Sequence, residues 1–284
     1  MGYAILTRLM KHDVKQPACL LEVLQILAPE SSKNTLRSWL QSGRVSINRK
    51  PAYKANESLL PGQVVEIGPR VAFLRSLRIL HQDDSLVVLE KPEGLLSVAT
   101  DFETKATVHA YLKKQFHQRR VFPVHRLDRE TSGVMLFAYT EKAREDLKLQ
   151  FENHQIDKTY YAVVEGQMEG QGTWESYLLE DDFYYVKSTA GAFGKKATTC
   201  YEVLKTSRNR SLLLLKPKTG RKNQLRVHCS EAGHPMIGDK KYGAKTNPGK
   251  RVFLHAQKIS FLHPTTQRLM TFEAPLPEIF SKIL

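Results

Sequence analysis

Between residues 77 and 284 the apolar residues fall into many short runs of strand length, separated by turn residues. One run ends at Leu89 and soon meets Pro92, whose missing N–H prevents a central strand from continuing. Further strands are predicted at 134–139, 198–204, 212–216, 252–254 and 270–273, and within KTYYAVVEG. Helical spacing of apolar residues occurs at 104–116, at 143–151 and between 221 and 233. Many strands mixed with few helices predict an α+β domain.

The first 70 residues carry a pattern of their own. Two helices are predicted from apolar residues at helical spacing: Leu20, Val23, Leu24 and Leu27 in the first, and Leu36, Trp39 and Leu40 in the second. Alternating Val45 and Ile47, and the segment VVEI after Pro61-Gly62, then predict strands. We therefore expect a tail at 1–16, a small α+β domain at 17–70, a short junction at 69–76 and a larger domain at 77–284.

Five basic residues of the small domain lie where its helices give way to strands: Lys33, Arg37, Arg44, Arg49 and Lys50. Lys33 and Arg37 are one helical turn apart, and the other three follow at the turn into the strands. This arrangement predicts an edge that contacts RNA phosphates. The segment SKNTLRSWLQSGRVSINRKPAYKANESLLPGQVVEIG resembles the small RNA-binding domain of a ribosomal small-subunit protein, and a generic accessory domain is the alternative.

The charge balance favours nucleic acid as the partner. The 284 residues include 43 Lys and Arg against 29 Asp and Glu, a formal net charge of +14. Such a surface attracts phosphate, although charge alone leaves open a basic surface that serves only solubility. Cys19, Cys200 and Cys229 lie far apart, so neither a disulfide framework nor a zinc site is indicated. No apolar run reaches membrane-spanning length, and we expect a cytoplasmic protein without membrane contact.

The segment FPVHRLDRETSGVMLFA joins a polar loop to an apolar strand. His125, Arg126 and Asp128 lie in the loop, which runs straight into the strand. A carboxylate is thereby placed at the end of a rigid sheet. From residue types alone, Asp128 beside Arg126 and Arg129 is also explained as a surface ion pair in a turn.

HRLDRETSG resembles the signature loop of the RluA-type pseudouridine synthases, which modify uridines of ribosomal and transfer RNA. Seven other segments stand in that family's order: DDSLVVLEKPEGL, KTYYAVVEG, GKKATTCYEVL, TGRKNQLRVH, AGHPMIGDKKYG, LHAQKISFLHP and FEAPLP. Matches in this order across 77–277 leave little room for chance. The resemblance implies the pseudouridine synthase fold, an α+β domain with a mixed, largely antiparallel sheet. It also implies an RNA isomerase that needs no cofactor.

The resemblance assigns three catalytic residues. Asp128 matches the catalytic carboxylate, which must be ionised near neutral pH to attack or stabilise the sugar. Arg226 matches an arginine that pairs with this carboxylate, and its charge is expected to lower the pKa of Asp128. Tyr160 matches the active-site tyrosine, whose ring can stack under the base and whose hydroxyl can serve in proton transfer. Tyr161, on the opposite face of the strand, is expected to be structural.

Substrate contacts are implied for six residues: His125, Arg126, Leu127, Arg221, Gln224 and Leu225. Because the target carbon is hidden in a stacked base, the nucleotide must flip into a pocket, and Arg126 is implied as the wedge that fills the gap. A phosphate contact explains Arg126 equally well. Phosphate contact is also the alternative for Arg221 and Arg226.

Two parts of the chain are open in the comparison with the family. Lys222-Asn223 stand where the family usually has Thr-His, and Leu225 where it has Ile, which bears on substrate choice more than on chemistry. The segment at 180–193 is either a hairpin that touches RNA through its aromatic residues at 183–185 or, as we expect, a packed turn.

No metal site is predicted, because the histidines, His228 and His255 among them, are scattered without a paired HxxxH or cysteine partners. We therefore expect a monomeric RNA-modifying enzyme that works without cofactor or metal. A catalytically silent RNA-binding or ribosome-assembly protein with the same fold is the alternative, and DNA binding is a third hypothesis.

Overall fold

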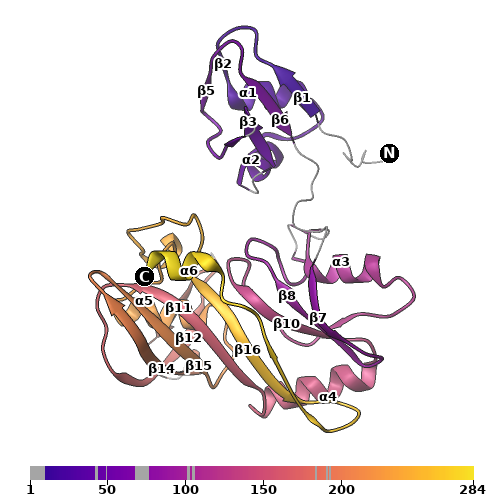
Figure 1. The fold of residues 1–284 in the computed structure, drawn as a ribbon, viewed down its shortest axis with the longest axis vertical. Coiled ribbons are helices and arrows are strands. Elements are labelled where there is room, and N and C mark those ends of the chain that lie inside the picture. The colour runs from indigo at the N-terminus through magenta and orange to yellow at the C-terminus, as the bar shows by residue number, and fades with distance from the viewer. Residues whose placement is uncertain are drawn as a thin grey trace. The chain divides into compact units, whose positions relative to one another are not determined.

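The computed structural model describes residues 10–41, 44–48, 50–67, 77–100, 103, 106–182, 184–189, 191 and 193–284. The chain forms two compact units, Met1–Ser76 and Leu77–Leu284 (Figure 1). Within the described residues, no helix combines the length and the apolar character that a membrane crossing requires.

The small unit packs two helices with two small sheets. Strands β1 (Met10–Asp13), β6 (Val64–Ile67), β3 (Val45–Ile47) and β4 (Lys50–Pro51) form one sheet in this order, and β2 (Ala18–Cys19) pairs with β5 (Ser58–Leu59). Helices α1 (Leu20–Leu27) and α2 (Lys33–Gln41) turn their apolar faces into a single core. Both helices predicted from apolar spacing are confirmed, because Leu20, Leu24, Leu36 and Leu40 are buried there.

The start of the small unit differs from the prediction of a tail at 1–16. Met10–Asp13 forms β1, which pairs with β6 and places Met10 opposite Ile67. A four-residue strand carries too little alternation to be recognised from sequence. Asn48 forms the turn after β3: its backbone is left-handed (φ 49°), and its side chain accepts a hydrogen bond from the N–H of Val64 at 2.8 Å.

The larger unit is built on one 11-stranded sheet, whose main path runs β13-β12-β14-β15-β11-β16-β10-β8-β7, with β17 paired to β16 and β9 to β10. The strands are β7 (Arg78–Gln82), β8 (Leu86–Lys91), β9 (Phe122–Pro123), β10 (Ser132–Ala138), β11 (Asp157–Glu165), β12 (Gln171–Glu180), β13 (Val186–Thr189), β14 (Lys195–Ser207), β15 (Arg210–Pro217), β16 (Leu254–Leu262) and β17 (Leu269–Glu273). Among the strands that the structure describes, β10 and β16 form the only parallel pair. The predicted mixed, largely antiparallel sheet is confirmed.

Helices cover parts of this sheet. Helix α4 (Glu141–Glu152) packs against β9 and β10, and α5 (Gln224–Glu231) packs against β12, β13 and β14. The remaining helices are α3 (Val108–Gln115), the short η1 (Lys240–Tyr242) and α6 (Glu278–Ile283). The helix predicted at 104–116 is confirmed but begins later, because Thr107 caps it by accepting a hydrogen bond from the N–H of Ala110.

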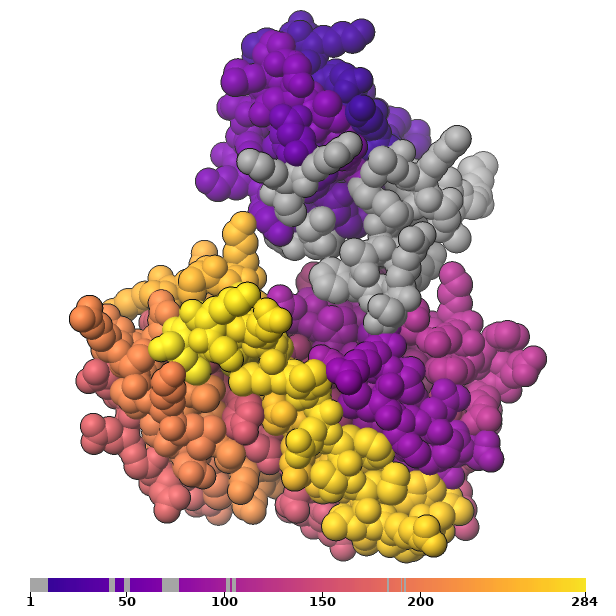
Figure 2. All heavy atoms as spheres, viewed as in Figure 1, coloured from indigo at the N-terminus to yellow at the C-terminus, as the bar shows by residue number. Residues whose placement is uncertain are grey.

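Strand β16 joins the two halves of the sheet. It pairs with β11 on one side and β10 on the other, and Figure 2 shows the C-terminal segment, in yellow, running between the earlier and later parts of the unit. The pairing with β10 is very close at Gly133, whose φ is 119° and whose missing Cβ would collide with the carbonyl of Ala256. This contact fixes the start of β10, directly after the loop that carries Asp128.

Candidate active site

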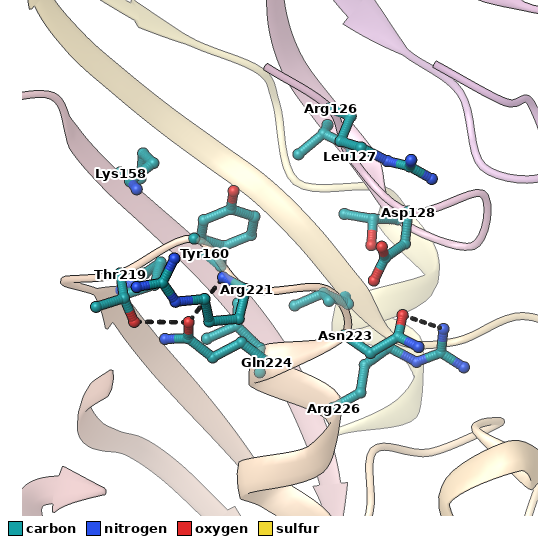
Figure 3. Close-up of a pocket in the computed structure, with 15 residues that line it drawn as sticks. Arg126, Leu127, Asp128, Lys158, Tyr160, Thr219, Arg221, Asn223, Gln224 and Arg226 are labelled. Atoms are coloured by element: carbon teal, nitrogen blue, oxygen red, sulfur yellow. Dashed lines mark hydrogen bonds between the residues drawn. The ribbon is translucent and has the colours of Figure 1, made fainter. Parts of the chain in front are cut away.

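An open pocket of about 510 Å³ lies where separate stretches of the larger unit meet (Figure 3). It is lined by Arg126, Leu127, Asp128 and Thr131 of the loop between β9 and β10, by Lys158 and Tyr160 of β11, by Pro217 at the end of β15, by Thr219, Gly220, Arg221 and Asn223 of the following turn, by Gln224, Leu225 and Arg226 at the start of α5, and by Leu254 of β16. Asp128, Tyr160 and Arg226, the three predicted catalytic residues, thus line one pocket. Of the predicted substrate contacts, only His125 does not line it.

The loop at 125–131, here called the Asp128 loop, is held by the segment that follows β8. Ser97 Oγ donates to the carbonyl of Leu127 (2.7 Å) and accepts from its N–H (3.0 Å). The N–H of Gly94 donates to the carbonyl of Arg129 (2.7 Å), and Arg129 Nε donates to the carbonyl of Gly94 (3.1 Å). The residues on both sides of Asp128 are therefore fixed by reciprocal hydrogen bonds.

A buried lysine, Lys91, lies under this contact. Its Nζ donates to the carbonyls of Pro92 (2.9 Å), Leu95 (2.7 Å) and Arg129 (3.3 Å). Burial lowers the pKa of Lys91 to about 7, although the charge of Glu130 and other carboxylates opposes the shift. Sequence reasoning gave this lysine no role, and its contacts tie the turn after β8 to the Asp128 loop.

His125 belongs to the packing of the loop and not to the pocket. Its Nε2 accepts a hydrogen bond from the N–H of Leu136 (3.0 Å), which requires a neutral ring with the proton on Nδ1. The ring stacks on Phe151 with centroids 4.9 Å apart, and burial lowers the pKa of His125 to about 3. The predicted substrate contact of His125 is therefore replaced by a structural role.

Asp128 is half-buried, and its carboxylate faces the pocket (Figure 3). The carboxylate forms no hydrogen bond or ion pair with any residue that the structure describes. Burial raises the pKa of Asp128 above its ordinary value of 3.8 and outweighs the charge of Arg226, which acts in the opposite direction. Arg226 thus lowers the pKa of Asp128 as the resemblance implies, but the loss of water on burial has the larger effect and the net pKa is raised.

Arg226 is 4% exposed and is held by Asp239, which is 1% exposed. Arg226 Nε donates to Asp239 Oδ2 (2.6 Å) and Nη2 donates to Oδ1 (2.7 Å), a bidentate pair. Its Nη1 reaches Glu130 (3.2 Å) and Asn223 (3.4 Å), and the guanidinium carbon lies 5.0 Å from the ring centroid of Tyr242. These contacts fix the guanidinium in place beside the pocket, which Arg226 also lines.

Arg226 and Asp128, both within the part of the chain that the structure describes, do not form the expected ion pair. Asp239 takes that place, and the influence of Arg226 on Asp128 is a longer-range attraction. Sequence reasoning missed Asp239, although it lies in the segment AGHPMIGDKKYG that carries part of the resemblance. An acidic residue inside a matched segment was the available signal.

Tyr160 follows a register shift in β11, between Thr159 and Tyr160. Its ring lines the pocket, and its hydroxyl forms no hydrogen bond with a described residue. Burial and the charge of Asp128 raise the pKa of Tyr160, so the phenol stays protonated at neutral pH. Tyr161 does not line the pocket, which agrees with the alternation of strand faces.

Lys158 also lines the pocket and was not identified from the sequence. In Figure 3 it lies on one side of the Tyr160 ring, and Asp128 lies on the other. Burial lowers the pKa of Lys158, against the attraction of Asp157, and its Nζ lies 5.8 Å from the ring centroid of Phe151. A lysine in a strand has no pattern that distinguishes it from a surface lysine, so only the fold reveals this cation.

Gln224 lines the pocket, but its polar atoms are already engaged. Its Oε1 accepts from Thr219 Oγ1 (2.7 Å) and from the N–H of Arg221 (3.0 Å). Its Nε2 donates to the carbonyl of Thr198 (3.0 Å) and to Thr199 Oγ1 (2.9 Å). A glutamine amide has two donors and a two-lone-pair acceptor, so nothing remains for a substrate. Gln224 therefore shapes the turn before α5.

Asn223 stands where the family usually has His. Its backbone is left-handed (φ 53°), a conformation that Asn tolerates better than most residues, and it begins α5. Asn223 Nδ2 donates to the hydroxyl of Tyr242 (2.9 Å), and Oδ1 accepts from Arg226 (3.4 Å). The residue thus links α5 to η1 and contacts the predicted catalytic arginine.

The other predicted substrate residues form the rim and wall of the pocket. Arg126 and Arg221 are exposed, and Arg221 Nε donates to the carbonyl of Lys196 (3.0 Å). Leu127 and Leu225 are buried and supply apolar surface. The pocket therefore combines an apolar wall with a basic rim, the composition that an extruded base on a phosphate backbone needs.

In the small unit, Lys33 and Arg37 are exposed on α2, as expected. The guanidinium carbon of Arg44 lies 4.4 Å from the ring centroid of Trp39. Arg49 lies outside the described residues, as does the side chain of Lys50. No group of three or more His, Cys, Asp or Glu side chains that could hold a metal occurs among the described residues.

Comparison with known proteins identifies a family for most of the larger unit. Residues 85–231 match the RNA pseudouridylate synthase family. The chain is 32% identical over 281 residues to ribosomal large subunit pseudouridine synthase D of Neisseria meningitidis, covering 90% of this chain and 75% of that protein. It is 35% identical over 233 residues to tRNA pseudouridine synthase C of Haemophilus ducreyi, covering 71% of this chain and 92% of that protein.

A solved structure agrees with this assignment. Human RNA pseudouridylate synthase domain containing 4 superposes with a TM-score of 0.60 at 27% identity and covers 72% of this chain and 90% of that one. The resemblance seen in HRLDRETSG and the segments around it is therefore confirmed, and with it the isomerase activity. The chain belongs to the RNA pseudouridylate synthase family, in its RluA-type group.

Proposed function

We propose that this chain isomerises uridine in ribosomal or transfer RNA to pseudouridine, with Asp128 as the catalytic carboxylate. The observation that carries the proposal is the free carboxylate of Asp128, which faces a pocket shared with Tyr160 and Arg226 and has no partner among the described residues. A carboxylate that served only the fold would be hydrogen-bonded or paired. Asp128 is instead left available for a substrate.

The substrate class follows from the relatives and from charge. One relative is named for the large ribosomal subunit and another for tRNA. The net charge of +14 favours a polyanion, and the basic rim at Arg126 and Arg221 lies where phosphates beside an extruded nucleotide would pass. All three catalytic side chains come from one chain, so a monomer is sufficient for the reaction.

The reaction exchanges one bond for another within the same nucleotide. The bond between C1′ of the ribose and N1 of uracil breaks, a bond between C1′ and C5 forms, C5 loses a proton and N1 gains one. Atoms and electrons balance without an oxidant, a reductant or a group donor, so we propose that no cofactor takes part. The uracil must turn within the pocket before it rejoins the sugar.

Asp128 is suited to the first step because it is poorly solvated. Positive charge develops at C1′ as the base departs, and an anion without competing hydrogen bonds attracts that charge more strongly than a hydrated one. The same carboxylate can bond to the sugar as a nucleophile. Arg226, held by Asp239, keeps the anion from becoming too basic by lowering the pKa of Asp128 against the effect of burial.

Tyr160 supplies a neutral phenol beside the base. Its ring can stack under the uracil and its protonated hydroxyl can exchange a proton with the reacting nucleotide. Arg126, two residues before Asp128 and exposed at the rim, fills the gap that the extruded uridine leaves in the RNA stack. In the small unit, Lys33, Arg37 and Arg44 contact the RNA backbone, and the predicted contacts of Arg49 and Lys50 extend that edge.

The test is direct mapping of pseudouridine. RNA from the source strain lacking this gene is incubated with the full-length chain and mapped by carbodiimide adducts. Wild type is expected to produce at least one new adduct site, Asp128→Asn none, and Asp157→Asn, which removes an exposed carboxylate of β11, the same site as wild type. If wild type binds the RNA but leaves the map as blank as Asp128→Asn, the chain is a silent RNA-binding protein.

A further inference from the structure

Lys222 and the turn between β12 and β13 have no role in the proposed function, and they meet beside the pocket. Lys222 stands where the family usually has Thr. Lys222 forms an ion pair with Glu180 at the end of β12, and its Nζ lies 5.2 Å from the ring centroid of Tyr184 in that turn. Lys222 also precedes Asn223, which lines the pocket.

The turn that carries Tyr184 is firmly held. The N–H of Tyr184 donates to the carbonyl of Asp181 (3.0 Å), and the N–H of Tyr185 donates to Asp181 Oδ1 (2.9 Å). Lys241 Nζ donates to the carbonyl of Tyr184 (3.0 Å). The backbone of Tyr184 is left-handed (φ 59°), which is uncommon for a bulky residue and is maintained by these contacts.

The turn is also fixed relative to the pocket. The ring of Tyr185 packs on that of Tyr242 with centroids 5.1 Å apart. Tyr242 in turn faces the guanidinium of Arg226 at 5.0 Å and accepts a hydrogen bond from Asn223 (2.9 Å). An unbroken series of side-chain contacts therefore connects the turn to two residues of the pocket.

Tyr184 itself is left outside this packing. Its side chain is 58% exposed, whereas Tyr185 is partly buried and Tyr242 is buried. The expectation of a packed turn thus holds for Tyr185 but not for Tyr184, and Phe183 lies outside the described residues. An exposed ring with an ammonium beside it is the arrangement that stacks an unpaired nucleic-acid base while the cation attracts its phosphate.

We propose that Tyr184 and Lys222 form a platform on which an unpaired RNA base next to the target uridine stacks. The proposal rests on the proposed function, because it names a second contact with the same RNA. Positive charge around the platform favours RNA over an apolar protein partner. Lys241 places a second ammonium group beside the same turn, with its Nζ 5.5 Å from the ring centroid of Tyr185 and 5.7 Å from that of Tyr242.

The experiment measures the affinity of the full-length chain for two RNA probes by filter binding. The first is a stem-loop transcript that carries the mapped uridine, made also with a single abasic ribose at each flanking position. The second is decauridylate, whose binding requires no turnover. Tyr184→Ala is expected to weaken binding of both probes about tenfold, the effect of losing one base–aromatic stack, and Tyr184→Phe to stay within about twofold of wild type.

The abasic series identifies the partner. At one flanking position, the abasic ribose is expected to weaken RNA binding by wild type about tenfold and to leave the affinity of Tyr184→Ala unchanged. The reason is that the Tyr184 ring and the missing base form a single stacking contact, which either change removes. The matched control is Phe193→Ala, which removes a ring that is 87% exposed in the turn just before β14. Its affinity should equal that of wild type.

Three outcomes overturn the platform. The first is that Tyr184→Ala and an abasic substitution weaken binding additively at every flanking position. The second is that Phe193→Ala and Tyr184→Ala lose the same amount of affinity. The third is that Tyr184→Phe loses affinity. Failure of the proposed function is distinguished by the decauridylate arm, because a chain that forms no pseudouridine still reports whether Tyr184 stacks a base.

Discussion

Replacing Asp239 by alanine leaves the buried guanidinium of Arg226 without its bidentate partner. The pair is almost wholly shielded from water, with both hydrogen bonds shorter than 2.8 Å, so solvent cannot replace the lost carboxylate. Removing one member of such a buried pair destabilises a protein by about 3–5 kcal/mol. In a domain of this size each kcal/mol lowers the melting temperature by about 2–4 °C, so Asp239→Ala is expected to melt roughly 6–20 °C below wild type.

The assay is thermal unfolding of the full-length chain followed by circular dichroism. The matched control is Glu273→Ala, which breaks an exposed ion pair with Lys258 at 3.2 Å. An exposed pair contributes at most about 1 kcal/mol, so the control is expected to melt within a few degrees of wild type. The reasoning is refuted if Asp239→Ala melts no lower than Glu273→Ala.

Asp239→Asn tests the catalytic side of the same pair. The amide keeps the shape of the carboxylate but not its charge, so Arg226 is expected to be attracted more strongly to Asp128 and to lower its pKa. The acid limb of the rate against pH should therefore move to lower pH, while the plateau rate falls because the anion becomes better compensated. An acid limb that stays in place or moves to higher pH contradicts the arrangement of charges described for the pocket.

Other perturbations test separate parts of the fold. Asp128→Asn is expected to abolish pseudouridine formation and yet to melt at a higher temperature than wild type at pH 7. The raised pKa of Asp128 means that its ionised form destabilises the fold, so this gain in melting temperature should shrink as the pH falls towards about 4. Scanning fluorimetry at both pH values checks this expectation. The free energy of unfolding is expected to rise with pH between about 7 and 10.5, with Lys91 alone contributing about 1.4 kcal/mol per pH unit. The reason is that Lys91 keeps its ammonium proton to a higher pH in the unfolded chain than in the folded one. Urea titrations should show this rise in wild type and a smaller rise in Lys91→Met. Gly133→Ala is expected to leave the chain unfolded or insoluble, because its Cβ would strike the rigid carbonyl of Ala256, and a soluble variant that melts like wild type would show that the two strands can separate.

The spacing of apolar residues along the sequence predicted most helices and strands, but it could not predict which distant strands pair with each other. Leu20, Leu24, Leu36 and Leu40 lie at helical spacing and are buried as expected, since a helix needs only neighbours in sequence. Strand β1 was not predicted, because its four residues form a strand only by pairing with β6, which lies more than fifty positions later in the sequence. The parallel pairing of β10 with β16 was likewise invisible, because no local signal connects residues 132 and 255.

The site shows the same division. Asp128, Tyr160 and Arg226 were placed together by resemblance, and the structure brings them to one pocket. The partner of Arg226 was wrong, since the choice between Asp128 and Asp239 depends on distances that a sequence does not contain. His125 was placed in the pocket because of its position in the loop, whereas the direction of its ring is set by the N–H of Leu136.

The parallel contact between β10 and β16 can form only after nearly the whole chain has been synthesised. Loop 125–131 is made before the middle of the chain, but the strand that supports its exit into β10 and the wall residue Leu254 come near the end. Bringing together segments so far apart is a slow, late event in folding. We therefore expect a nascent chain to form no pseudouridine until β16 has left the ribosome, and a truncated product that lacks this strand to be inactive.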